Sequence, residues 1–469
     1  MSFSWSMLID LGIISFALLL ATLIRHRVHI FRKYLIPNSL AAGFLLLPFY
    51  NYLGPLIGLN TEGLRNLVFH LLNLSFIAMS LRTARRQSSG KGVFSMAVTI
   101  ISQYSIQSLV GLGITFLFIA TIIPSLFPTF GLLITLGFAL GPGQAFAIGT
   151  GWEQYGFIGG GSVGLTFAAM GFLFACFGGI FLINRAIRKN WIDKKSFTPI
   201  NSKNIRRETH KINISHTGES KAAQKIVAID PLSYNLAIVL GVYLLTFLLL
   251  KLITFTMLFA GNMGKDLGAG LWGITFIFAA MIAVLVKKIL IAFGIDHTID
   301  NQLLNRIAGT SVDIMVASSI AAISLKVVAQ YWLPITVMGL SGGIVTFISV
   351  LWLSSRMFRD YIFQRTILIY GALTGTLPTG LALLRVIDPE FETPASTDYM
   401  YAVGIVFFFA LPFIVSMNFP AYGYSTGKSF YYWITFCIYA AYLIFVLIAF
   451  RFIAGKGAFQ KAGKIWLKK

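Results

Sequence analysis

Charged residues are scarce in this chain. Only 11% of its 469 residues are charged, whereas 57% are hydrophobic, and the mean hydropathy is +0.80. A soluble protein of this length would carry about 25% charged residues. Many apolar runs approach the ~20 residues that a spanning helix needs. The sequence therefore predicts an all-α integral membrane protein.

Cysteine is almost absent, and so are the motifs of cofactor and nucleotide chemistry. Cys176 and Cys437 both lie in apolar segments, which favours two core residues over a disulfide. The chain has no His/Cys metal-ligand spacing, no Walker loop and no dinucleotide fingerprint. We therefore expect no cofactor and no ATP-driven pump. No nucleophile–base pair or metal cluster suggests an enzyme.

Basic residues, by contrast, are in excess, giving a formal net charge of +21. They lie in the loops between apolar segments. Such placement is typical of membrane topology, in which cytoplasmic loops are rich in Lys and Arg. We therefore predict that these basic residues lie beside the lipid bilayer, and that the protein does not bind nucleic acid.

The apolar segments predict about eleven transmembrane helices. Two further segments, 130–150 and 361–386, are apolar but interrupted by glycine and proline. The predicted helices lie near residues 5–24, 36–53, 66–81, 93–120, 162–184, 233–257, 270–286, 309–328, 334–355, 399–418 and 430–450.

The basic residues predict how the segments cross the membrane. We let both interrupted segments be re-entrant hairpins, which enter and leave on one side, and place the N-terminus outside. Of the 37 Lys and Arg residues, Arg65, Lys265 and Lys428 then face outside, Lys251 and Lys326 lie in helices, and the rest face the cytoplasm. If only one of the two segments spanned, either the central linker or the basic tail would lie outside, against the positive-inside rule.

This topology divides the chain into two inverted repeats. In each repeat, four helices precede a glycine-rich hairpin and one helix follows it. The linker and the C-terminus lie in the cytoplasm. The divisions are a first repeat at 1–184, a basic linker at 185–230, a second repeat at 231–420, and an extra helix with a basic tail at 421–469.

The two interrupted segments are the most informative feature of the sequence. The first reads LGPGQAFAIG over 140–149, and the second reads YGALTGTLPTG over 370–380. Breaking a helix in lipid leaves backbone groups unpaired, at several kcal/mol each, unless protein or a water-filled cavity pairs them. One such break in each half of the chain is the best sequence indication of a transporter's binding site.

The first break offers groups that suit an anionic solute. Gly141 and Gly143 have no side chain, so they leave backbone amides and carbonyls accessible. The Gln144 side chain adds a hydrogen-bond donor and an acceptor. A helix N-terminus beyond the break can hold a carboxylate. The alternative is a bend that lets helices pack closely.

The second break offers neutral oxygen ligands. Thr374, Thr376 and Thr379 supply hydroxyls that suit Na⁺, beside the bare backbone of Gly375. Pro378 removes an amide donor and frees a carbonyl one turn back. The alternative is that the hydroxyls bond to their own helix. Deep carboxylates are scarce, which favours Na⁺ over a proton relay.

Two further polar pairs are candidates for the same cavity. Asn38 and Ser39 open the second helix after Pro37, where they face a cavity or simply cap the helix. Ser416 and Asn418 end the tenth helix, where Asn418 offers a carbonyl to an ion or caps at the membrane surface. His70 is a candidate proton carrier or a satisfied buried histidine.

Four motifs, in order along 30–420, resemble those of the bacterial sodium/glutamate symporter family. Residues 34–43 (YLIPNSLAAG) look like that family's Y-x-I-P…-A-G-G, and 153–157 (EQYGF) are similar to its E-R-Y-G-F. Residues 371–380 fall where the family has G-x-G-x-G-A-T-P-T, and Asn418 ends the corresponding helix. The first loop departs from the family's G-G-x-G-x-G, and Val415 stands where the family has Asp.

The resemblance implies ten helices in an inverted repeat, with the two loops meeting at the midplane. It also implies a homodimer in the bacterial inner membrane that carries glutamate inward with Na⁺. The family's loops carry over onto 141–149 and 374–380 of this chain.

Together these observations predict a secondary transporter that symports Na⁺ with a small anionic solute, glutamate or a related carboxylate. The predicted solute ligands are Gly141, Gly143, Gln144, Asn38 and Ser39. The predicted ion ligands are Thr374, Gly375, Thr376, Pro378, Thr379, Ser416 and Asn418. Alternatives are a proton-coupled or exporting carrier of another metabolite, and a non-transporting membrane sensor or scaffold.

Overall fold

The protein is an all-α, multi-pass membrane protein. In the part of the chain that the structure describes, the secondary structure is helical and no strand is present. Ten of the described helices are long and apolar enough to cross a membrane. Residues 192–229, most of the predicted linker, lie outside the described residues. The computed structural model describes residues 5–82, 90–191, 230–260, 268, 271–388, 392–455, 458–459 and 462–467.

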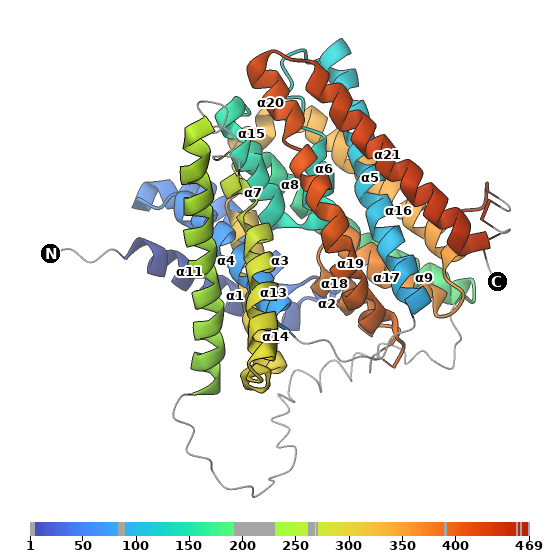
Figure 1. Ribbon diagram of the computed structural model, residues 1–469, viewed down its shortest axis with the longest axis horizontal. Coiled ribbons are helices and arrows are strands. Elements are labelled where there is room, and N and C mark those ends of the chain that lie inside the picture. The colour runs from blue at the N-terminus through green and yellow to red at the C-terminus, as the bar shows by residue number, and fades with distance from the viewer. Residues whose placement is uncertain are drawn as a thin grey trace, which may run out of the picture.

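Six helices form a first bundle, which takes three helices from each half of the chain. Within it α4 packs along α14, α3 packs on α14, and α13 packs on α4. Figure 1 shows this bundle on the left. Its members are α1 (Ser6–Arg27), α3 (Asn38–Pro48), α4 (Glu62–Leu81), α11 (Pro231–Met257), α13 (Thr275–Ala292) and α14 (Asn301–Ala321).

A second bundle, on the right of Figure 1, contains the remaining long helices. Here α5 is central, because α16, α19 and α21 all pack against it. The members are α5 (Gly90–Thr121), α8 (Gly160–Leu173), α9 (Gly179–Arg188), α16 (Trp332–Met357), α17 (Ile362–Thr374), α19 (Ala395–Ser416) and α21 (Phe430–Ala454).

A short helix, α7 (Pro142–Gly151), joins the two bundles. It packs along α8 of the second bundle and also contacts α4 and α14 of the first. The first interrupted segment therefore lies at the junction of the bundles.

The helix predicted at 309–328 is divided differently in the structure. Its residues belong to α14, which begins earlier, at Asn301, and to the short α15 (Leu325–Gln330). Asp300 caps α14 by accepting hydrogen bonds from the amides of Gln302 and Leu303, at 2.7 and 3.2 Å. Polar residues in its first half exclude α14 from the apolar spans, so the described part of the chain has ten such helices where about eleven were predicted.

The outer surfaces of both bundles are apolar. On α11, for example, Leu244 and Leu252 are 59% and 60% exposed. Lipid tails are as apolar as these side chains. Exposing the side chains to lipid therefore avoids the free-energy cost of exposing them to water. This surface is what a membrane-spanning bundle requires.

Candidate functional site

The first broken segment (Leu132–Gly151) breaks at Gly141. It consists of α6 (Leu132–Thr135), the π-helical η3 (Leu136–Leu140) and α7. Gly141 has φ +102° and ψ 173°, a region that only glycine adopts without strain. Pro142 then starts α7 with a preset φ and no amide to satisfy. The dipeptide Gly141–Pro142 therefore fixes the break at this position.

Both arms of this segment pack closely on α8. A Cβ atom built on Gly137, before the break, would lie 2.6 Å from the amide nitrogen of Ala168. One built on Gly149, after the break, would lie 2.5 Å from the carbonyl oxygen of Gly160. The glycines thus allow backbone contact along both arms.

The start of α7 presents backbone donors to the break. The amides of Gly143 and Gln144 lie in the first turn, which has no carbonyl partners within the helix. Among the described residues no group accepts a hydrogen bond from either amide. The Gln144 side chain is 5% exposed and lies beside Gly141. These groups and the positive end of the helix dipole suit a carboxylate.

The second broken segment (Ile362–Arg385) breaks between α17 and α18 (Leu377–Arg385). The backbone at Gly375 has φ −137° and ψ −106°, and Thr376 is extended. The two arms fold onto one another, since a Cβ on Gly371 would lie 2.7 Å from the Cα of Gly380. Pro378 lies in the first turn of α18, where its missing amide costs nothing.

The three threonines of this break have different partners. The hydroxyl of Thr374 donates to the carbonyl oxygen of Tyr370 at 2.7 Å, so it bonds back to its own helix. The hydroxyls of Thr376 and Thr379 lie 3.3 Å apart and share one hydrogen bond. All three hydroxyls thus keep oxygen lone pairs available near the break, because Thr374 only donates and just one of Thr376 and Thr379 accepts from the other.

The two breaks meet in the structure, although 235 residues separate Gly141 from Thr376. A Cβ atom on Gly141 would lie 3.7 Å from the Cγ2 methyl of Thr376. η3 packs against α17, and Gly171 of α8 faces the carbonyl oxygen of Thr374. One location therefore combines the N-terminus of α7, the C-terminus of α17 and the N-terminus of α18.

A row of buried polar side chains on α5 lies next to the second break. The Nε2 of Gln107 donates to Thr346 Oγ1 at 2.7 Å and to the Leu373 carbonyl at 3.3 Å. The Oε1 of Gln107 is buried and has no partner in the described part of the chain, and the same holds for Nε2 of Gln103. An unpaired buried acceptor costs about 1–3 kcal/mol. A bound cation at Gln107 Oε1 would remove that cost.

Gly143 places the first break against the first bundle. A Cβ on this glycine would lie 2.6 Å from Cδ1 of Leu72 on α4 and 2.9 Å from the sulfur of Met315 on α14. The start of α7 is therefore in direct contact with α4 and α14 of the first bundle.

Asn38 and Ser39 lie at the start of α3, among contacts that do not include the breaks. Asn38 Nδ2 donates to Thr22 Oγ1 at 2.9 Å, and its Oδ1 accepts from Arg25 at 3.4 Å. Ser39 is 3% exposed and lies on α3, which packs against α14. These contacts tie α3 to α1 and α14, and a role in binding the solute stays a prediction for both residues.

Ser416 and Asn418 also have contacts away from the breaks. The Ser416 hydroxyl donates to the carbonyl of Phe413 on its own helix. Asn418 Oδ1 accepts from the indole of Trp152 at 2.8 Å, just after the end of α7. Asn418 thus lies at the far end of α7 from Gly141, and its role at the ion also stays a prediction.

The described contacts of the ionisable residues His70 and Asp10 do not reach the meeting point of the breaks. His70 is hydrogen-bonded to Tyr243 at 2.7 Å, between α4 and α11. Asp10 accepts from Tyr50 at 2.6 Å, between α1 and the π-helical η1 (Phe49–Leu53). Within the described residues no cluster of three His, Cys, Asp or Glu residues could hold a metal ion. The meeting point consists of neutral oxygens and amides.

The sequence analysis missed the row on α5. Gln103 and Gln107 are four residues apart, so they share one face of the helix, and both are 0% exposed. Two glutamines at this spacing inside a run of apolar residues could have been detected in the sequence. Their position beside the second break could not be predicted, because it depends on how α5 packs on α17.

No family model, curated protein or solved structure matches this chain.

Proposed function

We propose that the protein is a secondary transporter that symports Na⁺ with a small anionic organic solute by alternating access. The observation that carries the proposal is the meeting of the two breaks, Gly141–Pro142 and Gly375–Thr376. Broken helices that meet between two helix bundles are how transporters bind ligands at the membrane midplane. Glutamate, or a related carboxylate, is the proposed solute, by the resemblance of the sequence motifs.

The packing of the helices supports the proposed inverted repeats. If α1, α3, α4, α5 and α6 correspond to α11, α13, α14, α16 and α17, contacts should occur in matched pairs. α1 packs on α3 as α11 packs on α13, and α3 packs on α14 as α13 packs on α4. α5 packs on α6 as α16 packs on α17. This reciprocity is what a two-fold relation between the halves produces.

The same comparison supports re-entrant hairpins. In the first broken segment both arms lie along α8, and in the second the two arms lie against each other. We propose that each segment enters the bilayer and returns on the same side. Its freed backbone groups then face a site enclosed by protein, where they escape the cost of contact with lipid.

In the proposed site the solute and the ion use different groups. The amides of Gly143 and Gln144, with the Gln144 side chain, would hold a carboxylate at the start of α7. Oxygens of Thr376, Thr379 and Gln107 would hold Na⁺ near the end of α17. Each ligand neutralises charge for the other, so binding of either should favour binding of the other.

Na⁺ coupling is favoured over proton coupling by the position of His70. This histidine bonds to Tyr243 between α4 and α11, and no described contact links it to the breaks. The neutral oxygens at the breaks cannot carry a proton at physiological pH.

The test is uptake of radiolabelled L-glutamate by the purified protein in proteoliposomes, with and without an inward Na⁺ gradient. Thr376→Val should raise the Na⁺ concentration for half-maximal uptake about tenfold, the effect of losing one polar ligand. Thr336→Val, which removes an exposed hydroxyl from α16, is the matched control and should change nothing.

Na⁺-dependent glutamate uptake with a selective effect of Thr376→Val would support both the mechanism and the solute. If Na⁺ raises the midpoint of thermal unfolding but glutamate is not taken up, the ion site stands and the solute is another anion. If Na⁺ affects neither uptake nor thermal stability, the proposal is wrong.

A further inference from the structure

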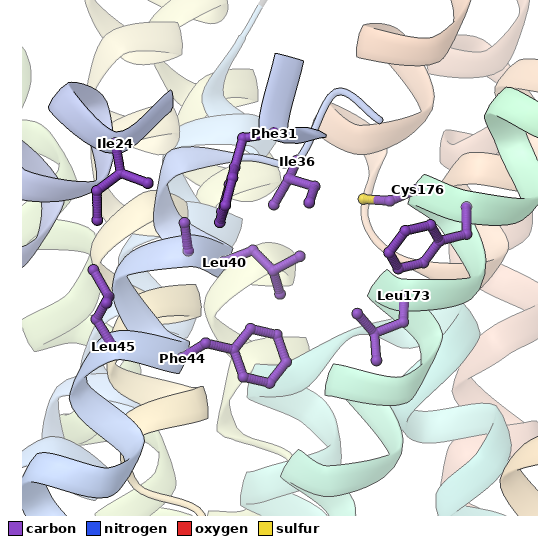
Figure 2. A pocket seen from close by; sticks show the side chains of 10 residues that line it. Ile24, Phe31, Ile36, Leu40, Phe44, Leu45, Leu173 and Cys176 are labelled. Atoms are coloured by element: carbon purple, nitrogen blue, oxygen red, sulfur yellow. The ribbon is translucent and has the colours of Figure 1, made fainter. Parts of the chain in front are cut away.

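A groove of about 220 Å³ separates α3 from the π-helical η5 (Phe174–Gly178), which connects α8 to α9. All ten residues that line it are apolar, and Figure 2 shows their side chains converging from both walls. Leu40 and Phe44 lie on the wall formed by α3, and Leu173 and Cys176 lie on the opposite wall. No polar side chain in the lining could bind a water-soluble ligand, so the groove suits hydrocarbon.

Two basic residues, Arg25 and Lys33, lie close to one end of this groove. Arg25 follows the lining residue Ile24 and donates to Asn38 at 3.4 Å, at the start of α3. The ammonium of Lys33 lies 5.5 Å from the centre of the Tyr34 ring. That ring in turn lies 4.8 Å from the ring of Phe177, which lines the groove.

No acidic side chain in the described part of the chain forms an ion pair with these two basic residues, whereas Arg365 forms two ion pairs. The last turn of α1 is basic throughout (Arg25, His26, Arg27), and α9 also ends in basic residues. The end of the groove is therefore a positive site at the edge of a membrane span.

We propose that the groove binds an anionic phospholipid, with an acyl chain between α3 and η5 and the phosphate beside Lys33. Basic residues next to a transmembrane helix attract anionic headgroups, and an apolar slot between helices accommodates a chain. A zwitterionic lipid could place its chain there but would gain less from the cations. The proposal stands whether or not the protein transports Na⁺.

The location of the groove gives the lipid a structural role. One wall belongs to the first bundle and the other to the second, so the lipid contacts both. A ligand that binds one arrangement of two parts stabilises that arrangement by its differential affinity. The bound lipid would therefore hold the two bundles in the relation seen in the structure.

The experiment measures the midpoint of thermal unfolding of the full chain in a neutral detergent. Phosphatidylglycerol and phosphatidylcholine with the same acyl chains are added separately. We expect phosphatidylglycerol to raise the midpoint by roughly 3 °C more than phosphatidylcholine does. Equal effects of the two lipids would overturn the proposal.

Variants locate the effect. Leu173→Trp fills the groove and should abolish the response, whereas Leu23→Trp, at a lipid-facing position outside the lining, should keep it. Lys33→Gln should reduce the phosphatidylglycerol response to the level of phosphatidylcholine. Lys288→Gln, which changes an exposed cation on α13, should not. A normal response in Leu173→Trp would place the lipid elsewhere and contradict the proposal.

A labelling experiment tests the same point without a bulky substitution. In a Cys437→Ser background, Leu173→Cys introduces a partly exposed thiol into the groove, while Cys176 is 1% exposed. Phosphatidylglycerol should slow alkylation of this thiol by N-ethylmaleimide several-fold, and phosphatidylcholine should slow it less. Equal alkylation rates with the two lipids would exclude occupation of the groove by the anionic lipid.

Discussion

At the scale of single residues, the most demanding feature is the buried arginine of the second broken segment. Arg365 is 1% exposed and pairs at 2.6 Å with Asp398, which is 0% exposed, and at 2.6 Å with Asp360. A buried charge is tolerated only when it is paired and hydrogen-bonded. This pair joins the start of α17 to the start of α19 and fixes the base of the segment.

Removing the buried partner should therefore destabilise the protein. Asp398→Ala leaves the guanidinium of Arg365 without its buried carboxylate, and we expect a loss of about 3–5 kcal/mol in the free energy of unfolding. Unfolding in mixed micelles of increasing dodecyl sulfate content would measure it.

Asp360→Ala is the control, because the Asp360 side chain is 60% exposed and should contribute no more than about 1 kcal/mol. Equal losses in the two variants would show that the burial of Asp398 is unimportant.

At the scale of secondary-structure elements, glycine determines how closely α5 approaches the first broken segment. A Cβ on Gly111 would lie 2.0 Å from the carbonyl oxygen of Gly131. Two hydrogen bonds from α5 hold the same contact. The hydroxyl of Thr115 accepts from the amide of Gly131 at 2.8 Å, and the hydroxyls of Ser108 and Thr135 are hydrogen-bonded at 2.7 Å. The contact is between backbones, so no side chain can yield to relieve it.

A single methyl group at this contact should therefore disturb the site. We expect Gly111→Ala to push α6 away from α5, to lower the midpoint of thermal unfolding and to abolish Na⁺-dependent uptake. Gly113→Ala is the matched control on the same helix, because its Cβ would meet nothing within 4 Å.

The control should be neutral or slightly stabilising, since alanine is the better helix former by about 1 kcal/mol. Wild-type uptake in Gly111→Ala would mean that α5 and α6 can separate without consequence for the site.

The sequence predicted those elements whose cause is local. Gly141–Pro142 and Gly375 to Pro378 break their helices by their own backbone chemistry, and the structure has both breaks there. Features that depend on packing between distant segments were not predictable. The bond from Trp152 to Asn418 and the pairing of Arg365 with Asp398 each join residues that no sequence pattern relates.

The start of α14 also depends on packing that the sequence pattern does not reveal. Asn301, Asn305 and Arg306 make its first turns too polar for an apolar span, so the sequence suggested a later start for the helix. The structure starts α14 at Asn301 because Asp300 caps it and because α3 and α4 cover its apolar face. Burial by neighbours replaced the apolar run that a lipid-exposed helix would need.

At the scale of the whole molecule, several basic segments gather through direct contacts. Lys287 of α13 donates to the carbonyl of Arg82, which follows α4, at 2.8 Å. Near the C-terminus, Trp466 stacks on Trp191 with ring centres 4.4 Å apart, and Arg356 donates to the carbonyl of Lys464. The positive-inside rule predicts that these segments face the cytoplasm.

Labelling of single cysteines would test this orientation. In a background without Cys176 and Cys437, a membrane-impermeant maleimide added to right-side-out vesicles should label Lys428→Cys. It should not label Lys288→Cys until the vesicles are opened. Both positions are exposed in the structure, so a difference reports sidedness and not burial. The reverse pattern would invert the topology.

In the proposed transporter, the extra helix α21 would make the two repeats energetically unequal. Two repeats of identical sequence could exchange conformations, and the outward-open and inward-open states would then be equally populated without ligand. In the proposed pairing of helices, α21 has no counterpart among the described residues of the first half, and its main contacts are with α5, α16, α19 and α20 (Phe419–Thr426). It therefore adds an energy term to one side of the exchange only. In the proposed carrier, the resting population without ligand, and hence the side from which it would most readily accept solute, would therefore depend on a helix that lies outside the two proposed repeats.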